Sequence, residues 1–402
     1  MLQGKHILIG ISGGIAAYKI PELIRSLIKE GAQVRVTTTR NALQFVTELT
    51  LQTLTNARVY SDVFAAINEH STEHISLPDW ADMMLIAPAT ANVLGKMVAG
   101  IADDALTTTF AATVARKPVV IAPAMNDKMY ENPATQKAMT ILSQMPNVTV
   151  IDCAEGFLAC GTTGKGRMQE IDVLQEEVIK SFYAKDLAHK RILITAGPTQ
   201  EALDPVRYIS NHSSGKMGIA LARECTRRGA DVTLVLGPCS TPLKGGEAAK
   251  VINVVSAQDM YQAATHEWEK QDAAILCAAV ADFTPTQKAE HKIKKAEGQT
   301  ELNLHLTLTP DIAAALGAAK TENQRLIGFA LETQNEDANA RKKLNSKNFD
   351  MIVLNSLQDA GAGFSVDTNK VTLIDHTTTH NLPLMSKQEV AQRIVDAISA
   401  LL

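Results

Sequence analysis

The sequence predicts an α/β protein made of two Rossmann-like, doubly wound domains with mainly parallel sheets, the N-terminal one flavodoxin-like. Three observations support this. Each half opens with a short apolar strand, a glycine-containing loop and an amphipathic helix that ends at glycine; a second strand follows each helix; and strand–helix alternation continues in both halves. A chain of 402 residues is also too long for a single ordinary hydrophobic core, which favours two domains.

The first opening begins with the apolar strand 5–10, which is followed by Gly13 and Gly14. An amphipathic pattern then predicts a helix that ends near Gly31, since glycine favours the left-handed conformation that terminates helices. The next strand begins at Ala32. This is the start of a βαβ unit, whose connecting helix lies on one face of a parallel sheet.

The second opening repeats this order. A strand is predicted over 190–195, a helix from about Ser214 to Gly229, and a strand over 230–235. Between the halves, the polar segment 184–190 follows a predicted helix over 171–182. We therefore place one domain at residues 1–188 and the other at 189–402.

Composition excludes several classes of protein. A net charge of -4 gives no reason to expect nucleic acid as a partner, and 4% aromatic residues provide few stacking platforms for single strands. The five cysteines include no C-x-x-C pair, so neither a disulfide framework nor a zinc site is indicated. Without a signal-like N-terminus or an apolar run of about 18 residues, we expect a cytoplasmic protein with no membrane contact.

Polar residues at predicted strand ends indicate a ligand site in the first half. Gly13 and Gly14 precede a helix, whose N-terminal N–H groups attract phosphate, although a glycine turn needed only for packing is the alternative. Two further strand ends run into APATAN and PAMN, and a glycine-rich loop carries the thiol of Cys160.

These motifs resemble the flavin-containing cysteine decarboxylases, in particular phosphopantothenoylcysteine decarboxylase. The resemblance is carried by GISGGIAAYK, APATAN, PAMN-x-x-M and ACG-x-x-G-x-GRM, with Tyr130 where the family often has tryptophan. It implies FMN, which takes a hydride before CO2 leaves and returns it afterwards. The residues implied to bind FMN are Gly13, Gly14, Ile15 and Thr38 for the phosphate and Thr90 and Asn92 for the ring.

The same resemblance implies roles for individual side chains. His74 would act as a base, Asn126 would bind the substrate carboxylate with Met125 beside it, and Cys160 would supply a proton from a substrate-covering flap. From the residues alone, His74 could be a histidine at a strand edge, Asn126 a helix cap, and Cys160 a loop thiol of no consequence.

The second half carries its own motifs. Serines and a glycine precede the predicted helix near 214, and a lysine-rich KIKK lies at 292–295, where charge alone favours a solvated face. The set RYISNHSSGKMG, AAVADF, KIKK, TPDI and GFALET resembles phosphopantothenate–cysteine ligase over nearly the whole half. The resemblance implies that CTP and Mg²⁺ activate the substrate carboxylate as an acyl-cytidylate, which cysteine then attacks.

In the ligase family, Asn211 is expected to bind the acyl-cytidylate, Lys292 to face the triphosphate, and Arg207 to lie near the substrate or a dimer contact. Two positions depart from the family pattern, Thr309 and Leu331. The metal ligands stay unassigned, because no acidic cluster has a clear Mg²⁺ geometry. The residues implied for the CTP site are Asp282, Lys292, Pro310, Asp311, Ile312, Phe329, Lys343 and Lys347.

Two other functions were considered. A nicotinamide-dependent oxidoreductase predicts G-x-G-x-x-G and an acidic residue after the second strand, where this chain has threonines at 37–39. A flavin-binding regulatory protein predicts loss of His74 or of the flap cysteine, and both are present. The resemblance also implies a homo-oligomer acting on small molecules, in which flavin-domain trimers assemble further into a dodecamer and the ligase domains pair as dimers.

Overall fold

The computed structural model describes residues 2–64, 72–157, 161, 163–243, 246–295, 300–332, 335–356 and 366–402. It divides into two compact units, and the boundary in the sequence lies between Tyr183 and Ala184, at the start of the polar segment 184–190. In the described ranges, no helix is long and apolar enough to cross a membrane.

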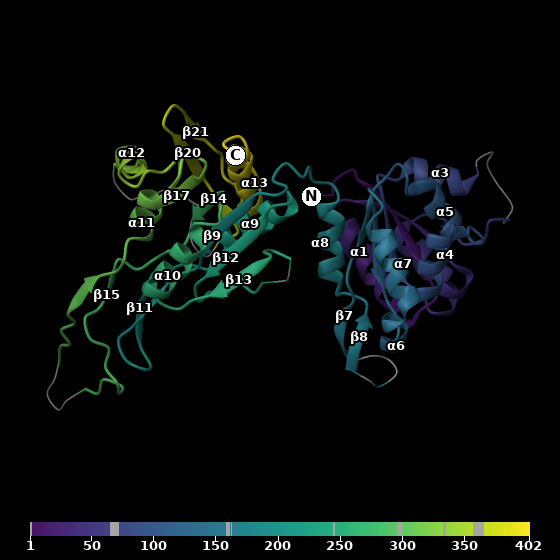
Figure 1. Ribbon diagram of the computed structural model, residues 1–402, viewed down its shortest axis with the longest axis horizontal. Coiled ribbons are helices and arrows are strands. Elements are labelled where there is room, and N and C mark those ends of the chain that lie inside the picture. Colours follow the sequence, from purple (N-terminus) through teal and green to yellow (C-terminus); the bar gives the residue numbers. More distant parts are fainter. Residues whose placement is uncertain are drawn as a thin grey trace. The chain divides into compact units, whose positions relative to one another are not determined.

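The first unit contains a six-stranded parallel sheet (Figure 1). Its strand order is β3-β2-β1-β4-β5-β6. This is the strand order of the Rossmann fold, in which the third strand pairs outside β2 and β4 pairs beside β1. The strands are β1 (His6–Ile11), β2 (Gln33–Thr38), β3 (Val59–Tyr60), β4 (Met83–Ala89), β5 (Val119–Pro123) and β6 (Val148–Val150).

Helices cover both faces of this sheet, because successive strand residues point to opposite sides. Ile7, Ile9 and Ile11 pack into one core cluster, whereas Leu8 packs into the other. One face carries α1 (Ile20–Lys29), α2 (Glu48–Thr55) and α8 (Ile171–Lys180). The other carries α3 (Glu73–Trp80), α4 (Ala91–Ala99), α5 (Ala105–Thr113) and α7 (Pro133–Ser143).

Shorter elements complete the unit at the edge where the strands end. The 3₁₀ helices η1 (Ile15–Lys19) and η2 (Arg40–Gln44) follow β1 and β2, and α6 (Asp127–Glu131) follows β5. An antiparallel hairpin of β7 (Ala154–Phe157) and β8 (Thr163–Arg167) projects beside α6, as Figure 1 shows.

The second unit contains an eight-stranded sheet in the order β13-β12-β9-β14-β17-β18-β20-β21. It is parallel from β13 to β18, and its last two strands are antiparallel. The strands are β9 (Arg191–Ala196), β12 (Asp231–Leu236), β13 (Lys250–Asn253), β14 (Ala273–Leu276), β17 (Arg325–Glu332), β18 (Met351–Ser356), β20 (Val371–Asp375) and β21 (Thr379–Asn381).

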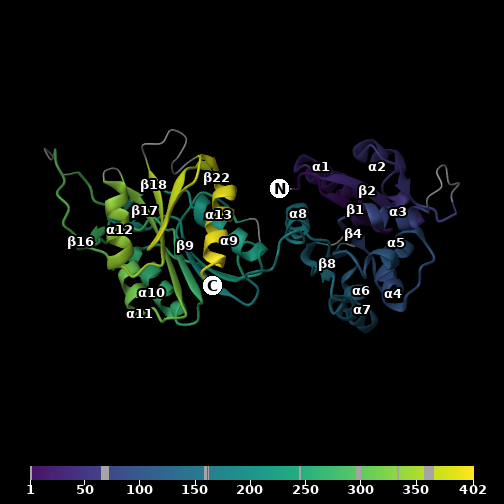
Figure 2. The ribbon, with the colours of Figure 1, turned by 90° about the horizontal axis from the view of Figure 1, so that it is seen from above.

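Two helix layers enclose this sheet (Figure 2). One comprises α9 (Lys216–Arg227) and α13 (Lys387–Ser399). The other comprises α10 (Ala257–Trp268), α11 (Ile312–Ala319) and α12 (Glu336–Ser346). A two-stranded ribbon of β19 (Thr368–Asn369) and β22 (Met385–Ser386) precedes α13. The predicted Rossmann-like, mainly parallel architecture is therefore confirmed for both units.

Two antiparallel ribbons extend from the second unit: β10 (Gln200–Ala202) with β11 (Tyr208–Ser210), and β15 (Phe283–Pro285) with β16 (Leu306–Leu308). Asp204 joins them. Its buried carboxylate accepts hydrogen bonds from the backbone N–H of Val206, Arg207 and Ile293. Although burial opposes ionisation, these bonds lower the pKa of Asp204, so the junction is held by a charged carboxylate.

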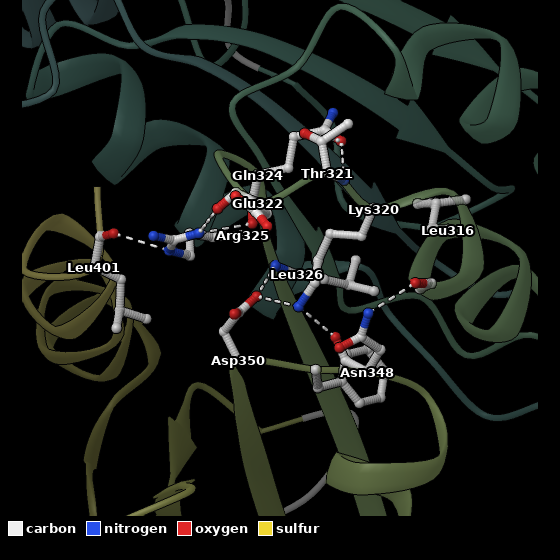
Figure 3. A network of polar contacts seen from close by, with 12 residues as sticks. Leu316, Lys320, Thr321, Glu322, Gln324, Arg325, Leu326, Asn348, Asp350 and Leu401 are labelled. Atoms are coloured by element: carbon white, nitrogen blue, oxygen red, sulfur yellow. Dashed lines mark hydrogen bonds and ion pairs between the residues drawn. The ribbon is translucent and has the colours of Figure 1, made fainter.

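At the opposite end of the sheet, a polar network ties the starts of β17 and β18 together (Figure 3). The Lys320 ammonium donates to Asp350 Oδ2 at 3.0 Å and to the Asn348 carbonyl at 2.6 Å. Asp350 Oδ2 also accepts from Leu326 N at 2.7 Å, and the Arg325 guanidinium donates to the Leu401 carbonyl. These hydrogen bonds pair the polar groups of the loops that precede the strands. The opposite edge of the sheet, where the strands end, is available for a ligand site.

An ionic cluster attaches the interdomain segment to the second unit. Arg228, only 9% exposed, donates to both Asp186 oxygens and to Asp396. Ser399 donates to Asp186 Oδ2 at 2.6 Å. The hydrogen bonds from Arg228 lower the pKa of Asp186 to about 2, against an unfolded value near 3.8. The stabilisation from Asp186 is thus fully present above pH 4 and is lost as the pH falls toward 2.

We predict that Asp186→Asn lowers the stability of the second unit by about 1 kcal/mol at pH 7, because Asp186 is partly solvated. The melting temperature should fall by about 2–4 °C. The two tryptophans, Trp80 and Trp268, lie in different units, so Trp268 fluorescence in a Trp80→Phe background reports the second unit. Stability lost between pH 5 and pH 2 should be smaller in the variant than in its parent; equal losses would contradict the role of Asp186.

Candidate functional site

The first unit holds a cavity of about 910 Å³ where β1, β2, β4 and β5 end. The order of strands reverses between β1 and β4, which is where open α/β sheets form ligand crevices. Of the residues predicted for the flavin and its substrate, those that line the cavity are Gly13, Gly14, Ile15, Thr90, Asn92, Met125 and Asn126.

The floor of this cavity depends on close backbone approach. A Cβ at Gly13 would lie 2.6 Å from Asn41 Cβ, and one at Gly14 would lie 3.3 Å from Thr90 Cγ2. Ser12 Oγ donates to the Pro88 carbonyl at 2.7 Å and accepts from Thr90 N at 3.0 Å. The loops after β1 and β4 are thereby locked together around a narrow cradle.

The hydroxyl groups of Thr37, Thr38 and Thr39 are buried and have no hydrogen-bond partner in the described part of the chain. Buried donors without partners are costly, and a bound anion would satisfy one. Of these three residues Thr39 lines the cavity, whereas Thr38, the one predicted to lie near the flavin phosphate, is fully buried beside it.

Asn126 lies where β5 gives way to α6, and its side-chain oxygen accepts from Lys128 N at 3.0 Å. It is therefore the helix cap that the sequence allowed, and it also lines the cavity. Phe157 and Gly166, from the two strands of the hairpin, line the same cavity. The remaining catalytic candidate of the flap, Cys160, lies outside the described residues.

His74 does not line the cavity of its own unit. It lies in the first turn of α3, not at a strand edge as the sequence suggested. Pro78 inside that helix obscured the helical pattern. A single chain therefore brings Asn126 to the cavity without His74.

Sequence reasoning missed several charged groups around this cavity. Lys19 and Arg167 both donate to Glu170, and Lys96 pairs with Asp103 at 2.6 Å and Asp104 at 3.2 Å. Lys19, Arg167, Lys96 and Asp104 all line the cavity. The signal that could have found Lys96 is its position one helical turn after Asn92.

The second unit holds a cavity of about 830 Å³, where β9, β14, β17 and β18 end. It too lies at a reversal of strand order, between β9 and β14. The predicted residues that line it are Asn211, Asp282, Pro310, Asp311, Ile312, Phe329, Lys343 and Lys347; the two departures from the family pattern, Thr309 and Leu331, line it as well.

Local hydrogen bonds fix the polar wall of this cavity. Asn211 Nδ2 donates to the Val280 carbonyl at 2.9 Å. Thr309 N donates to the Asp282 carbonyl at 3.0 Å, and its hydroxyl donates to the Ala281 carbonyl at 2.7 Å. Thr309, which departs from the family pattern, therefore stabilises the wall of the cavity through these two hydrogen bonds.

Two lysines that line the cavity, one on α12 and one at its C-cap, pair with carboxylates. Lys343 pairs with Glu332 at 2.7 Å, and Lys347 pairs with Asp311. Against the effect of its burial, the hydrogen bond from Lys347 lowers the pKa of Asp311, which also caps α11 through Ala314 N. Because one turn of helix separates the lysines, both can meet one anionic ligand.

Arg207 and Lys292 do not line the cavity of their own chain, and the parts expected of them stay predictions. The Arg207 guanidinium donates to the Ile293 carbonyl at 3.1 Å, so it holds the two ribbons together. Lys292 is exposed on the segment that joins β15 to β16. These positions depend on pairing between distant ribbons, which local sequence does not reveal.

Two unpredicted lysines line the second cavity. Lys216 begins α9 and pairs with Asp367 at 2.6 Å, and the nearly buried Lys387 begins α13. Burial and the neighbouring Lys216 lower the pKa of Lys387. Lys216 was visible within the motif SSGKMG, whereas Lys387 reaches the cavity only through the packing of the last helix on α9. In the described ranges, no group of three or more metal-ligating side chains occurs.

Both halves match known families. Residues 1–183 match the family described as Flavoprotein, and residues 187–402 match the DNA/pantothenate metabolism flavoprotein C-terminal domain. The chain is 45% identical to the Coenzyme A biosynthesis bifunctional protein CoaBC of Bacillus subtilis (strain 168), over 100% of this chain and 98% of that protein. It is 48% identical to a cysteine/cysteine sulfinic acid decarboxylase of an unknown prokaryotic organism, over 89% of this chain and 99% of that one.

Among solved structures, the chain is similar to the crystal structure of the C-terminal domain of a Coenzyme A biosynthesis bifunctional protein CoaBC. The sequence identity is 40%, the TM-score is 0.46, and the match covers 54% of this chain and 98% of that one.

We predict that Thr39→Val stabilises the ligand-free first unit by about 1 kcal/mol, since it removes a buried hydroxyl without a described partner. The same change should weaken the binding of FMN about tenfold, because a hydrogen bond to the charged phosphate is lost. Calorimetry and flavin titration measure both effects. Thr113→Val is the control, since the Thr113 hydroxyl already donates to the Thr109 carbonyl at 2.7 Å. A Thr39 variant that binds FMN as the parent does would exclude this hydroxyl from the phosphate site.

Proposed function

The chain belongs to the family of bifunctional coenzyme A biosynthesis proteins, and we propose that its second unit ligates 4′-phosphopantothenate to cysteine with CTP while its first unit decarboxylates the product with FMN. The observation that carries this proposal is that one chain holds two separate cavities, each at a reversal of strand order and each lined by the predicted motif residues.

The first cavity fits a phosphate-bearing flavin. Gly13 provides a cradle that a side chain would fill, and the Thr39 hydroxyl lacks a described partner that a phosphate oxygen would supply. The cavity volume of about 910 Å³ is sufficient for a flavin and a substrate together.

When bound, the flavin would supply a reversible two-electron oxidation that makes the thiol-bearing carbon an electron sink for the departing CO2. Asn126 would orient the substrate carboxylate through its amide N–H. Because the amide is neutral, it would stabilise the negative charge of the carboxylate less than a cation would. Cys160 would donate the proton that completes the product. His74 would act as the early base.

Because His74 does not reach the cavity in its own unit, we propose that a second copy supplies it in the flavin-domain trimer. Apolar side chains at the cavity rim, among them Ile15, Tyr18 and Phe157, are exposed and would be covered by such a contact. On the second unit, Val206, Tyr208, Phe283 and Leu308 are exposed on the ribbons and suit a dimer contact. Such a contact would also bring Arg207 or Lys292 to a neighbouring cavity.

In the second cavity, the substrate carboxylate would attack the α-phosphorus of CTP and release pyrophosphate. The cysteine amine would then attack the acyl carbon and release CMP. The lysines that line the cavity would offset the phosphate charge. Mg²⁺ would be held mainly by substrate phosphates, with Asp282 and Asp311 as the carboxylates that line the cavity, which matches the preference of Mg²⁺ for few protein ligands.

The deciding experiment supplies 4′-phosphopantothenate, cysteine, CTP and Mg²⁺ to the protein and identifies products by mass. The proposal requires CMP, pyrophosphate, CO2 and 4′-phosphopantetheine, and a flavin spectrum, and we expect the enzyme to act in the cytoplasm. The likeness to a cysteine/cysteine sulfinic acid decarboxylase gives the second candidate. CO2 release from cysteine or cysteine sulfinate alone, without ligation, would favour that activity.

We predict that Cys160→Ser leaves ligation intact but stops decarboxylation at an oxidised, decarboxylated intermediate, because serine is a far weaker acid than a thiol. Mass spectrometry of the quenched reaction should detect this species. A normal yield of phosphopantetheine would remove Cys160 from the mechanism.

We predict that Asn211→Asp blocks ligation after activation, so that acyl-cytidylate accumulates. The substitution replaces a donor to the Val280 carbonyl with a carboxylate, which would repel both that carbonyl and the anionic intermediate. Loss of product without detectable acyl-cytidylate would assign Asn211 to the first step. Decarboxylation of added phosphopantothenoylcysteine by the same variant is the internal control.

A further inference from the structure

A three-residue polar cluster attaches the β7–β8 hairpin to helix α6. Tyr130 lies on α6, Asp152 lies two residues before the start of β7, and Lys165 lies on β8. The Tyr130 hydroxyl donates to Asp152 Oδ1 at 2.7 Å, and the Lys165 ammonium donates to Oδ2 at 2.5 Å. Lys165 Nζ also lies 5.4 Å from the centroid of the Tyr130 ring. We call these residues the Asp152 cluster.

The hairpin has a second attachment at the start of α6. Met125 N donates to the Gly166 carbonyl at 2.9 Å. A Cβ at Gly166 would lie 2.5 Å from the Met125 carbonyl oxygen, and one at Gly164 would lie 2.9 Å from Asp127 Cβ. This contact sets the spacing between β8 and residues 125–127, and the buried Cys153 thiol, which donates to the Pro123 carbonyl at 3.4 Å, holds the start of the hairpin to β5. Neither contact fixes the tilt of the hairpin relative to the far end of α6.

The Asp152 cluster removes that freedom because it acts at the other end of α6. Tyr130 is itself anchored, since Gln136 on α7 donates to its carbonyl at 2.6 Å. The hairpin is thus attached at Met125 and at Tyr130. Two attachment points fix the orientation of the hairpin, whereas a single point would let it rotate. The chain segments so oriented lead directly to Asn126 on one side and, along the sequence, to residues 158–162, which include Cys160, on the other.

Burial and the adjacent carboxylate raise the pKa of Tyr130, which therefore remains a hydrogen-bond donor at neutral pH. Hydrogen bonds from Lys165 and Tyr130 outweigh the effect of burial and lower the pKa of Asp152. The Asp152 and Lys165 side chains are 59% and 45% exposed, so their ion pair contributes little to folding. The cluster is better suited to orient the hairpin than to stabilise the unit.

We propose that Tyr130 is a positioning residue for decarboxylation: through Asp152 and Lys165, its hydroxyl sets the orientation of the β7–β8 hairpin over the first cavity. The inference rests on the proposed function for the parts played by Asn126 and Cys160. It assigns a task to the one aromatic position at which this chain departs from the decarboxylase motif.

The test is Tyr130→Phe, which keeps the ring and removes only the hydroxyl. We expect kcat for decarboxylation to fall about tenfold, with KM, flavin content and ligation unchanged, because misorientation of a reacting group lowers the chemical rate. Adding Asp152→Asn should cause no further loss, because both changes break the same link. Hydrogen exchange at Met125 N and across residues 163–167 should accelerate in the variant, with or without flavin.

Tyr261→Phe, on α10 of the second unit, is the matched control and should alter neither measurement. Parental kcat or parental hydrogen exchange in Tyr130→Phe would overturn the inference. So would a lowered melting temperature or loss of flavin, since either would make Tyr130 a stabilising residue. If the parent protein releases no CO2 from phosphopantothenoylcysteine, the proposed function fails. The exchange comparison still decides in that case, since unchanged exchange would reject the Asp152 cluster as the hairpin anchor.

Discussion

The burial of parallel strands on both faces is the constraint on which both sites depend. The strands β1 and β9 contain almost only buried residues, so neither can carry a functional polar group along its length. Polar residues are admitted where the strands end, and the carboxyl ends of parallel strands share one edge. Each unit therefore gathers its reactive groups from loops distant in sequence, as Ser12 and Thr90 illustrate through their hydrogen bonds.

That constraint explains which parts of the sites the sequence could predict. The strand predicted over 5–10 is found at His6–Ile11, and the one predicted over 190–195 at Arg191–Ala196. Residues directly after such strands, including Gly13 and Asn126, were therefore placed at a ligand edge and do line cavities. Apolar runs and glycine positions are local signals, and they suffice for this level of description.

The residues that do not line the cavity of their own chain depend on information beyond their own segment. Thr38 and Thr39 are both buried, and only Thr39 lines the cavity, a difference of one residue that composition does not reveal. Arg207 is committed to Ile293, a partner 86 residues away, through the pairing of two ribbons. His74 lies on a helix that does not border its own cavity, so its proposed task requires a neighbouring copy.

Cations line both cavities, but the two proposed reactions make opposite demands on the groups that meet a substrate carboxylate. In decarboxylation the carboxylate must leave as neutral CO2, so a strong ion pair would stabilise the ground state and raise the barrier. The neutral amide of Asn126 avoids that effect. In ligation the carboxylate must approach a triphosphate, an encounter between like charges that cations make possible. Lys216, Lys343 and Lys347 border that cavity, each beside a carboxylate from which an anionic ligand could draw it. Under the proposed function, the neutral amide of Asn126 would therefore meet the carboxylate derived from cysteine in the first unit, whereas lysines would meet CTP and the 4′-phosphopantothenate carboxylate in the second, a division of chemistry that one site could not combine.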